Sequence, residues 1–124
     1  MKKQVLTYNI ESEKISALRQ ELKGLGCAVR EVSPKEYGVL LGALAGLDGY
    51  VYKKNAKPEG NVGSGFAVIC GFSGVGIDAV LAAFRRSKLG GEVLKAVLTD
   101  TNARWNSVEL YNEVKREHEY MTKR

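Results

Sequence analysis

The feature that most constrains the fold is an uninterrupted apolar run near the middle of the chain, bounded by Gly65 and Gly71. Its residues, Phe66-Ala67-Val68-Ile69-Cys70, show no alternation of polar and apolar side chains. This pattern predicts a strand that other elements cover on both faces. Because 124 residues are enough for one domain but not for two, the sequence predicts a single domain, residues 1–124, built around a doubly covered sheet.

Three other stretches also have strand character, and segments with apolar residues at steps of three and four separate them, as in amphipathic helices. The expected strands are Val5–Ile10, Cys27–Val32 and Val93–Leu98. Residues 47–64 are instead rich in turn-forming residues and predict one long loop.

Two helix starts are marked by capping boxes, in which a capping residue is followed three positions later by glutamate. The first is Ser33 with Glu36, and it predicts a helix that runs through Gly38 and Gly42 and ends at Gly46. Glycines four apart on a helix also allow another backbone to come close.

The second capping box is Asn106 with Glu109, and Trp105 before it is placed to pack on Leu110. The last helix should begin there. Its predicted inward-facing stripe consists of Leu110, Tyr111, Val114, His118 and Met121.

Strand–helix alternation predicts an α/β fold: a four-stranded, mostly parallel sheet in the order 2-1-3-4, with helices on both faces. The alternative is a ferredoxin-like α+β fold, which requires an antiparallel strand around Tyr50. Ligands of doubly wound sheets bind beyond the carboxyl ends of the strands, where the winding reverses. We therefore expect a crevice shared by Asn9, Ser73, Gly74 and Gly76 and flanked by Thr99, Asp100, Thr101 and Asn102.

The glycine-rich turn at 71–76 has two interpretations. With Ala79 as its last member, the segment that starts at Gly74 fits a dinucleotide fingerprint, whose backbone amides could hold a phosphate. Only 45 residues follow Ala79, too few to complete the nucleotide-binding half-fold, and Asp78 would repel an anion. A structural strand-to-helix turn is therefore favoured, with a phosphate- or nucleotide-handling enzyme as the alternative.

The net charge of +5 does not by itself indicate a nucleic-acid partner. Residues 53–57 contain three lysines, and Arg85, Arg86 and Lys88 form a second cluster. Because both clusters lie on predicted solvent faces and the charge is spread evenly along the chain, a solvated surface is favoured. Weak nucleic-acid binding through Arg85, Arg86 and Lys88 is the remaining alternative.

Few residues suggest catalysis or metal binding. His118 is the only histidine, Cys27 and Cys70 lie in strand-like runs, and no group has the spacing of metal ligands. We therefore predict no cofactor and no metal. The turn Thr99–Asn102 is expected to bond mainly with its own backbone.

The compartment and partners are predicted only in outline. No apolar run reaches the length of a signal peptide or a membrane span, and the two cysteines suit a reducing environment. We expect a cytoplasmic protein without a membrane partner. Homodimerisation stays open, because strands two and four are sheet edges.

Several segments resemble an uncharacterised bacterial family known as domain of unknown function 3783. The similarity rests on Val32-Ser33-Pro34, Leu41–Gly46, Gly71-Phe72-Ser73 and, most specifically, Leu94–Thr99 with Thr101-Asn102 and Trp105. The resemblance implies a small bacterial α/β domain and no assigned activity, substrate or cofactor. The residues themselves favour a non-enzymatic module that binds a small anionic ligand or a protein through the carboxyl ends of its strands.

Overall fold

The computed structural model describes residues 2–54, 56–91 and 93–122. Its centre is a four-stranded sheet in the order β2-β1-β3-β4, which confirms the predicted α/β class and strand order. The strands are β1 (Gln4–Tyr8), β2 (Ala28–Glu31), β3 (Phe66–Cys70) and β4 (Leu94–Val97). The segment around Tyr50 forms no strand, so the ferredoxin-like alternative is not adopted.

The two central strands run in opposite directions. β1 pairs parallel with β2, and β3 pairs parallel with β4, but β1 and β3 are antiparallel, with Tyr8 opposite Phe66 and Gln4 opposite Cys70. The chain leaves β2 and enters β3 at the same end of the sheet, because no full-length crossover helix carries it to the other end. The sheet is therefore mixed, although two of its three pairings are parallel.

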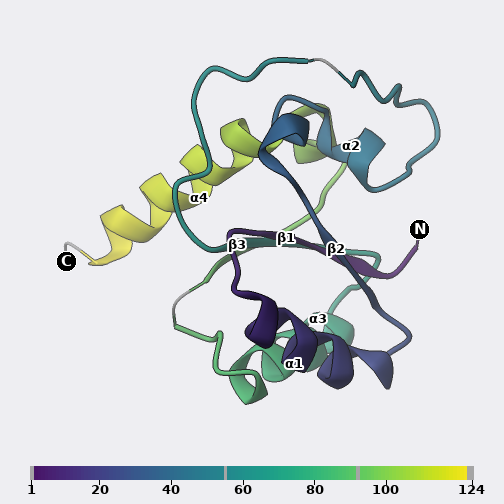
Figure 1. The fold of residues 1–124 in the computed structure, drawn as a ribbon, viewed down its shortest axis with the longest axis vertical. Helices are drawn as coiled ribbons and strands as arrows, with labels where there is room; N and C mark the ends of the chain where they lie inside the picture. Colours follow the sequence, from purple (N-terminus) through teal and green to yellow (C-terminus); the bar gives the residue numbers. More distant parts are fainter. Residues whose placement is uncertain (1, 55, 92, 123–124) are drawn as a thin grey trace.

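Helices cover both faces, as predicted (Figure 1). Helices α1 (Ser12–Lys23) and α3 (Val75–Arg86) lie side by side on one face, where residues such as Leu18, Phe84 and Ile69 form one apolar core. Helices α2 (Leu41–Leu44) and α4 (Ser107–Thr122) cover the other face. The run Phe66–Cys70 is buried along its whole length, which confirms the interpretation of the apolar run.

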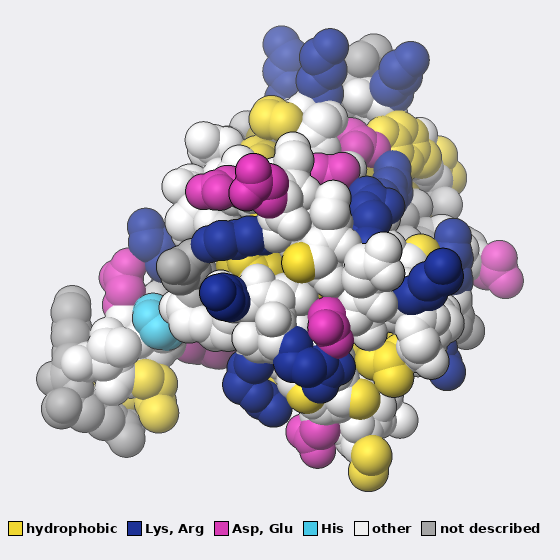
Figure 2. Space-filling view, turned by 60° about the horizontal axis from the view of Figure 1, so that its bottom comes forward, with side chains coloured by type: hydrophobic (Ala, Val, Ile, Leu, Met, Phe, Trp, Pro, Cys, Tyr) yellow, Lys and Arg dark blue, Asp and Glu magenta, His cyan; other side chains and the backbone are white. Residues whose placement is uncertain are grey.

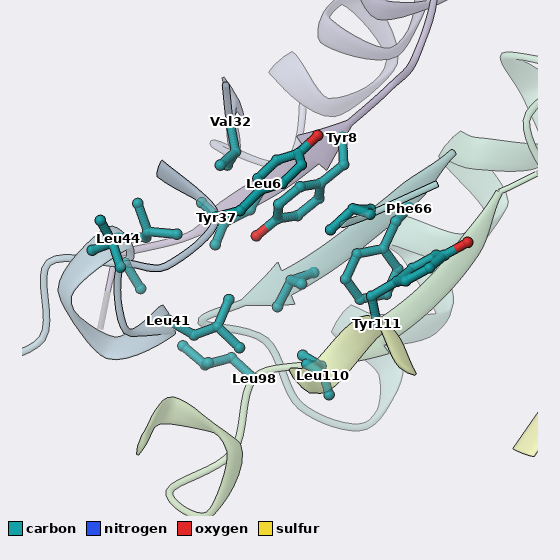
Figure 3. Packing of buried hydrophobic residues seen from close by; sticks show 14 of the residues in the cluster. Leu6, Tyr8, Val32, Tyr37, Leu41, Leu44, Phe66, Leu98, Leu110 and Tyr111 are labelled. Atoms are coloured by element: carbon teal, nitrogen blue, oxygen red, sulfur yellow. The ribbon is translucent and has the colours of Figure 1, made fainter. Parts of the chain in front are cut away.

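The core beneath α2 and α4 is rich in aromatic rings (Figure 3). The ring of Phe66 lies 5.2 Å from that of Tyr8 and 5.4 Å from that of Tyr111, measured between centroids. The Tyr8 hydroxyl is buried and forms a 2.6 Å hydrogen bond with the hydroxyl of Ser107. This bond satisfies two polar groups inside an apolar layer and ties β1 to the first residue of α4.

The helix predicted after Ser33 is wrong in its length. The structure has a single 3₁₀ turn, η1 (Pro34–Glu36), and then the short α2, with an extended residue, Leu40, between them. Leu40 forms an isolated bridge with Asn106, and the Leu41 amide donates to the Trp105 carbonyl at 2.8 Å. Tertiary pairing thus replaces the helical hydrogen bonds that the sequence pattern favoured.

The start of α4 is as predicted, but its end is not. The Asn106 and Glu109 side chains each accept a hydrogen bond from the other's backbone amide at 2.9 Å, which confirms the capping box. Leu110 and Tyr111 are buried, whereas His118 and Met121 are exposed. The last turns of α4 project away from the sheet (Figure 1), and therefore two of the five residues of the predicted inward stripe, His118 and Met121, face solvent. Within the described ranges, no helix has the length and apolar character needed to cross a membrane.

Candidate functional site

The expected crevice at the strand ends does not form as predicted, because Asn9 lies at the other end of the sheet. The carboxyl end of β1 meets the amino end of β3, where Tyr8 is opposite Phe66. Ser73, Gly74 and Gly76 follow the carboxyl end of β3. They therefore lie at the end of the sheet opposite to Asn9. The antiparallel pairing of β1 with β3, which the strand pattern did not reveal, separates Asn9 from these residues.

Asn9 instead fastens the end of the long loop to the sheet. Its side-chain amide donates hydrogen bonds to the carbonyls of Val62, at 2.6 Å, and Ser64, at 3.2 Å. Its backbone is left-handed, with φ at 55°, a conformation that asparagine adopts more readily than most residues. Val62 is buried just before β3. The visible role of Asn9 is therefore to position residues 62–64.

Two positions of the glycine-rich turn, Gly71 and Gly74, have a backbone conformation that favours glycine. Gly71 has φ at 84°, and a Cβ there would lie 2.6 Å from the Lys2 carbonyl oxygen. Gly74 has φ at 48° and immediately precedes α3. Ser73 and Gly74 are exposed, and Gly76 donates its amide to the Ser73 carbonyl at 2.9 Å. These contacts describe a tight strand-to-helix turn.

The turn after β4 lies at the same end of the sheet as the glycine-rich turn, because β3 and β4 are parallel. Its polar groups largely satisfy one another: the Asn102 side chain accepts from the Thr99 amide at 2.8 Å and donates to the Val97 carbonyl at 3.0 Å. The Asn102 amide in turn donates to the Thr99 hydroxyl at 3.1 Å. Asp100 and Thr101 remain exposed.

The basic cluster on α3 is partly neutralised by its neighbours. Arg86 forms a 2.6 Å ion pair with Glu21 of α1. Arg85 and Lys88 are exposed. Burial, and then the charge of Arg85, lower the pKa of Lys95, whose ammonium donates to the carbonyls of Gly90 and Val93. The cluster therefore lies on a charged face that also contains the acidic Glu21.

Residues 47–64, which the sequence predicts as a long loop, pack against η1 and α2. A Cβ on Gly42 would lie 2.7 Å from the Tyr50 ring, and a Cβ on Gly38 would collide with the Ala56 carbonyl. A backbone does come close at Gly38, but the neighbour of Gly42 is the Tyr50 ring, and the two glycines do not share a helix as predicted, since α2 spans Leu41–Leu44. At its far end, the loop is held by buried Val62 and by Asn9.

A carboxylate at the end of η1 also holds the loop. The Tyr52 hydroxyl donates to Glu36 Oε2 at 2.6 Å, and Arg30 donates to the same oxygen at 2.7 Å. The hydrogen bond from Tyr52 to Glu36 is the main reason why the pKa of Tyr52 is raised. The Glu36 side chain is only 17% exposed, whereas Arg30 is 36% exposed. The sheet, η1 and the loop thus meet at one ionic hydrogen-bonded group.

Beside this group lies a cavity of about 720 Å³, which we call the η1–loop groove. It is lined by Ser33, Pro34, Lys35, Glu36, Tyr52, Lys54, Ala56, Lys57 and Pro58. Its three lysines are exposed. Figure 2 shows Lys and Arg side chains gathered at the top of the view, the end of the molecule at which Figure 1 places the loop.

Sequence reasoning did not identify this groove, because it treated the lysines of residues 53–57 as a solvated face. Two signals were available: Gly38 and Gly42 predicted a close neighbour, and proline and tyrosine residues lie close to the lysines in the loop. Neither signal identifies which segment docks there. Only the folded chain brings η1, with Lys35, next to Lys54 and Lys57.

Comparison with known proteins supports the resemblance for the part of the chain that begins at β3, and not for its segments at 32–34 and 41–46. Residues 66–121 match the family model described as Domain of unknown function (DUF3783). The match covers the chain from the start of β3 to near the end of α4, and it leaves out every residue of the η1–loop groove. No curated protein and no solved structure matches the chain.

Proposed function

We propose that the protein is a non-enzymatic binding module. Its ligand carries negative charge and lies in the η1–loop groove. The observation that carries this proposal is the groove itself, which is lined by three lysines and by the apolar side chains of Pro34, Ala56 and Pro58. Its volume of about 720 Å³ falls within the range of roughly 300–1,000 Å³ that is typical of ligand sites.

The charges of the groove favour an anionic ligand. Lys35, Lys54 and Lys57 contribute three positive charges, and Glu36 is the one acidic side chain of the lining. That carboxylate already has Arg30 as its ion-pair partner. A surface of this kind attracts anions and accelerates their association, most strongly at low salt.

The docked loop supports binding because it forms the groove before a ligand arrives. Tyr50 packs over Gly42, Ala56 lies against Gly38, and Tyr52 is bonded to Glu36. A ligand that enters a preformed groove does not have to pay for ordering the loop.

The same contacts favour binding over proton-transfer chemistry. The Tyr52 hydroxyl is a hydrogen-bond donor to Glu36, and this bond raises the pKa of the tyrosine. A phenol with a raised pKa is a poorer source of a proton or of a phenolate nucleophile near neutral pH. The Tyr52–Glu36 pair therefore serves to hold the loop.

The proposal can be tested by titrating the isotope-labelled protein with two anionic probes, citrate and a glutamate-rich peptide. Backbone amide resonances of Lys35, Lys54 and Lys57 should shift with at least one probe. The double variant Lys54→Gln/Lys57→Gln should weaken binding about fivefold, as expected for two exposed charge pairs. Lys23→Gln/Lys115→Gln removes the same charge from other surfaces and should leave affinity unchanged. If neither probe shifts the groove amides, the proposed function is wrong.

We also propose that the protein works in a reducing, cytoplasmic environment. Cys27 and Cys70 are both free and buried, which agrees with thiols that stay reduced. Purified protein should contain two titratable thiols after unfolding without reductant. Recovery of fewer than two, with disulfide-linked species present, would contradict this proposal.

A further inference from the structure

The η1–loop groove contains cations, but all of them are exposed. Lys35, Lys54 and Lys57 are long, flexible side chains at the surface. A small anion held only by such side chains gains little, since solvent and salt screen each pair. A longer ligand that contacts several lysines at once gains binding free energy from each contact. It loses its translational and rotational entropy only once.

The rest of the lining fits a chain with apolar parts. Pro34 of η1 and Pro58 of the loop both line the groove. Tyr52 is held in place by its hydroxyl bond to Glu36. Proline and a fixed tyrosine lose little conformational entropy when a ligand packs on them. They therefore offer contact area to aliphatic groups between the charges of a ligand.

Glu36 distinguishes a peptide from a nucleic acid. Its Oε2 accepts from Arg30 and Tyr52, while the Ser33 amide, at 3.4 Å, is a weak donor to Oε1. A carboxylate oxygen can accept more than one hydrogen bond, so the carboxylate that lines the groove retains capacity for a further donor. Peptide backbones supply N–H donors, whereas a phosphate backbone supplies only acceptors and negative charge beside this carboxylate.

We infer that the ligand of the groove is an extended acidic segment of a partner protein. This inference rests on the function proposed above, and it specifies the chemistry of the ligand. Acidic side chains of the segment pair with Lys35, Lys54 and Lys57. Its apolar side chains pack on the prolines and Tyr52, and its backbone amides face Glu36.

The test compares three probes at equal ionic strength by calorimetry. They are an end-capped hexapeptide of alternating glutamate and leucine, citrate, and a short single-stranded oligothymidylate. The peptide should bind at least tenfold more tightly than either of the others, with shifts confined to groove amides. Lys54→Gln/Lys57→Gln should weaken peptide binding at least fivefold, and Lys23→Gln/Lys115→Gln should not.

Each other outcome is decisive. If citrate binds the groove as tightly as the peptide, the inferred ligand class is wrong while the proposed function stands. If oligothymidylate binds more tightly than the peptide, the groove is a nucleic-acid site and the inference is overturned. If no probe binds, both the inference and the proposed function fail.

Discussion

Asn9 shows how one residue can look like a ligand contact in the sequence and act as a structural one in the fold. A polar residue directly after a strand is a reasonable candidate for a strand-end site, and its residue type agrees with that role. The observed hydrogen bonds to Val62 and Ser64 instead use the side chain to position the chain before β3. The sequence contains no signal for this partner, which lies more than fifty positions away.

Substitution of Asn9 should therefore affect stability. Asn9→Ala removes both hydrogen bonds and places alanine at a positive φ, so the free energy of unfolding should fall by roughly 1–3 kcal/mol. Asn9→Gly removes the same bonds but tolerates the backbone, and it should cost less. Urea denaturation measures both. Equal stability of Asn9→Ala and the unmodified protein would show that these bonds contribute nothing.

At the residue scale, the two cysteines also show how burial changes the pKa of a thiol. Burial raises the pKa of Cys27 to about 11 and that of Cys70 to about 12, from an ordinary value of 9.0. Both thiols thus stay protonated in the folded protein at pH 8, where a thiol reagent should modify them only after denaturant is added. A folded protein that reacts at the rate of free cysteine would contradict this.

The same shifts give a direction to the pH dependence of stability. In the folded state these thiols hold their protons to higher pH than in the unfolded state. Their contribution is fully present below pH 9 and is lost as the pH rises toward 11 to 12. Thermal unfolding should therefore show a falling midpoint above pH 9, and Cys70→Ala should reduce this dependence.

At the scale of elements, the glycines of the segment from η1 to α2 decide how the loop docks. The helical pattern after Ser33 was interrupted because Leu40 pairs with Asn106, and because Gly38 and Gly42 contact the loop rather than another helix. The capping box of α4 was predictable because its two partners lie three residues apart. Docking between distant segments was not, since no local pattern encodes the partner.

Gly38→Ala should release the loop, because a Cβ there collides with the backbone of Ala56 and neither side can yield without moving the loop. Trypsin should then cleave after Lys53 or Lys54 at least several times faster than in the unmodified protein. Gly24→Ala adds the same methyl group where nothing lies within 4 Å, and its cleavage rate should not change. Equal rates for both variants would show that the loop is not held at Gly38.

The two ends of α4 should differ in their contribution to stability. Leu110 is 3% exposed and Met121 is 62% exposed, although both belong to the stripe that the sequence predicts as buried. Leu110→Ala should therefore cost about 2–4 kcal/mol, whereas Met121→Ala should cost less than about 0.5 kcal/mol. Chemical denaturation of both variants checks this. Similar losses would mean that the end of α4 is packed in solution.

At the scale of the whole molecule, strand order was predictable while strand direction was not. Apolar runs and glycine boundaries locate the strands, and the order 2-1-3-4 follows from the alternation of elements. Direction depends on whether the segment between β2 and β3 crosses the sheet, and residues 32–65 carry helix signals that suggest a crossover. The direction of β1 relative to β3 is the reason why the expected crevice does not form. Ser73 and Thr99 do lie at the same end of the sheet, because β3 and β4 are parallel.

The antiparallel pairing of β1 with β3 also affects how much the length of the segment between β2 and β3 can vary. A crossover connection must span the length of a strand, which sets a minimum length for it. Here the chain departs from β2 and rejoins the sheet at the same end, so the four strands place no such minimum on the intervening segment. The exposed part of the loop can therefore be lengthened or shortened while the strand pairings remain as they are, whereas α2 must stay because Leu41 and Leu44 belong to the core that covers the sheet.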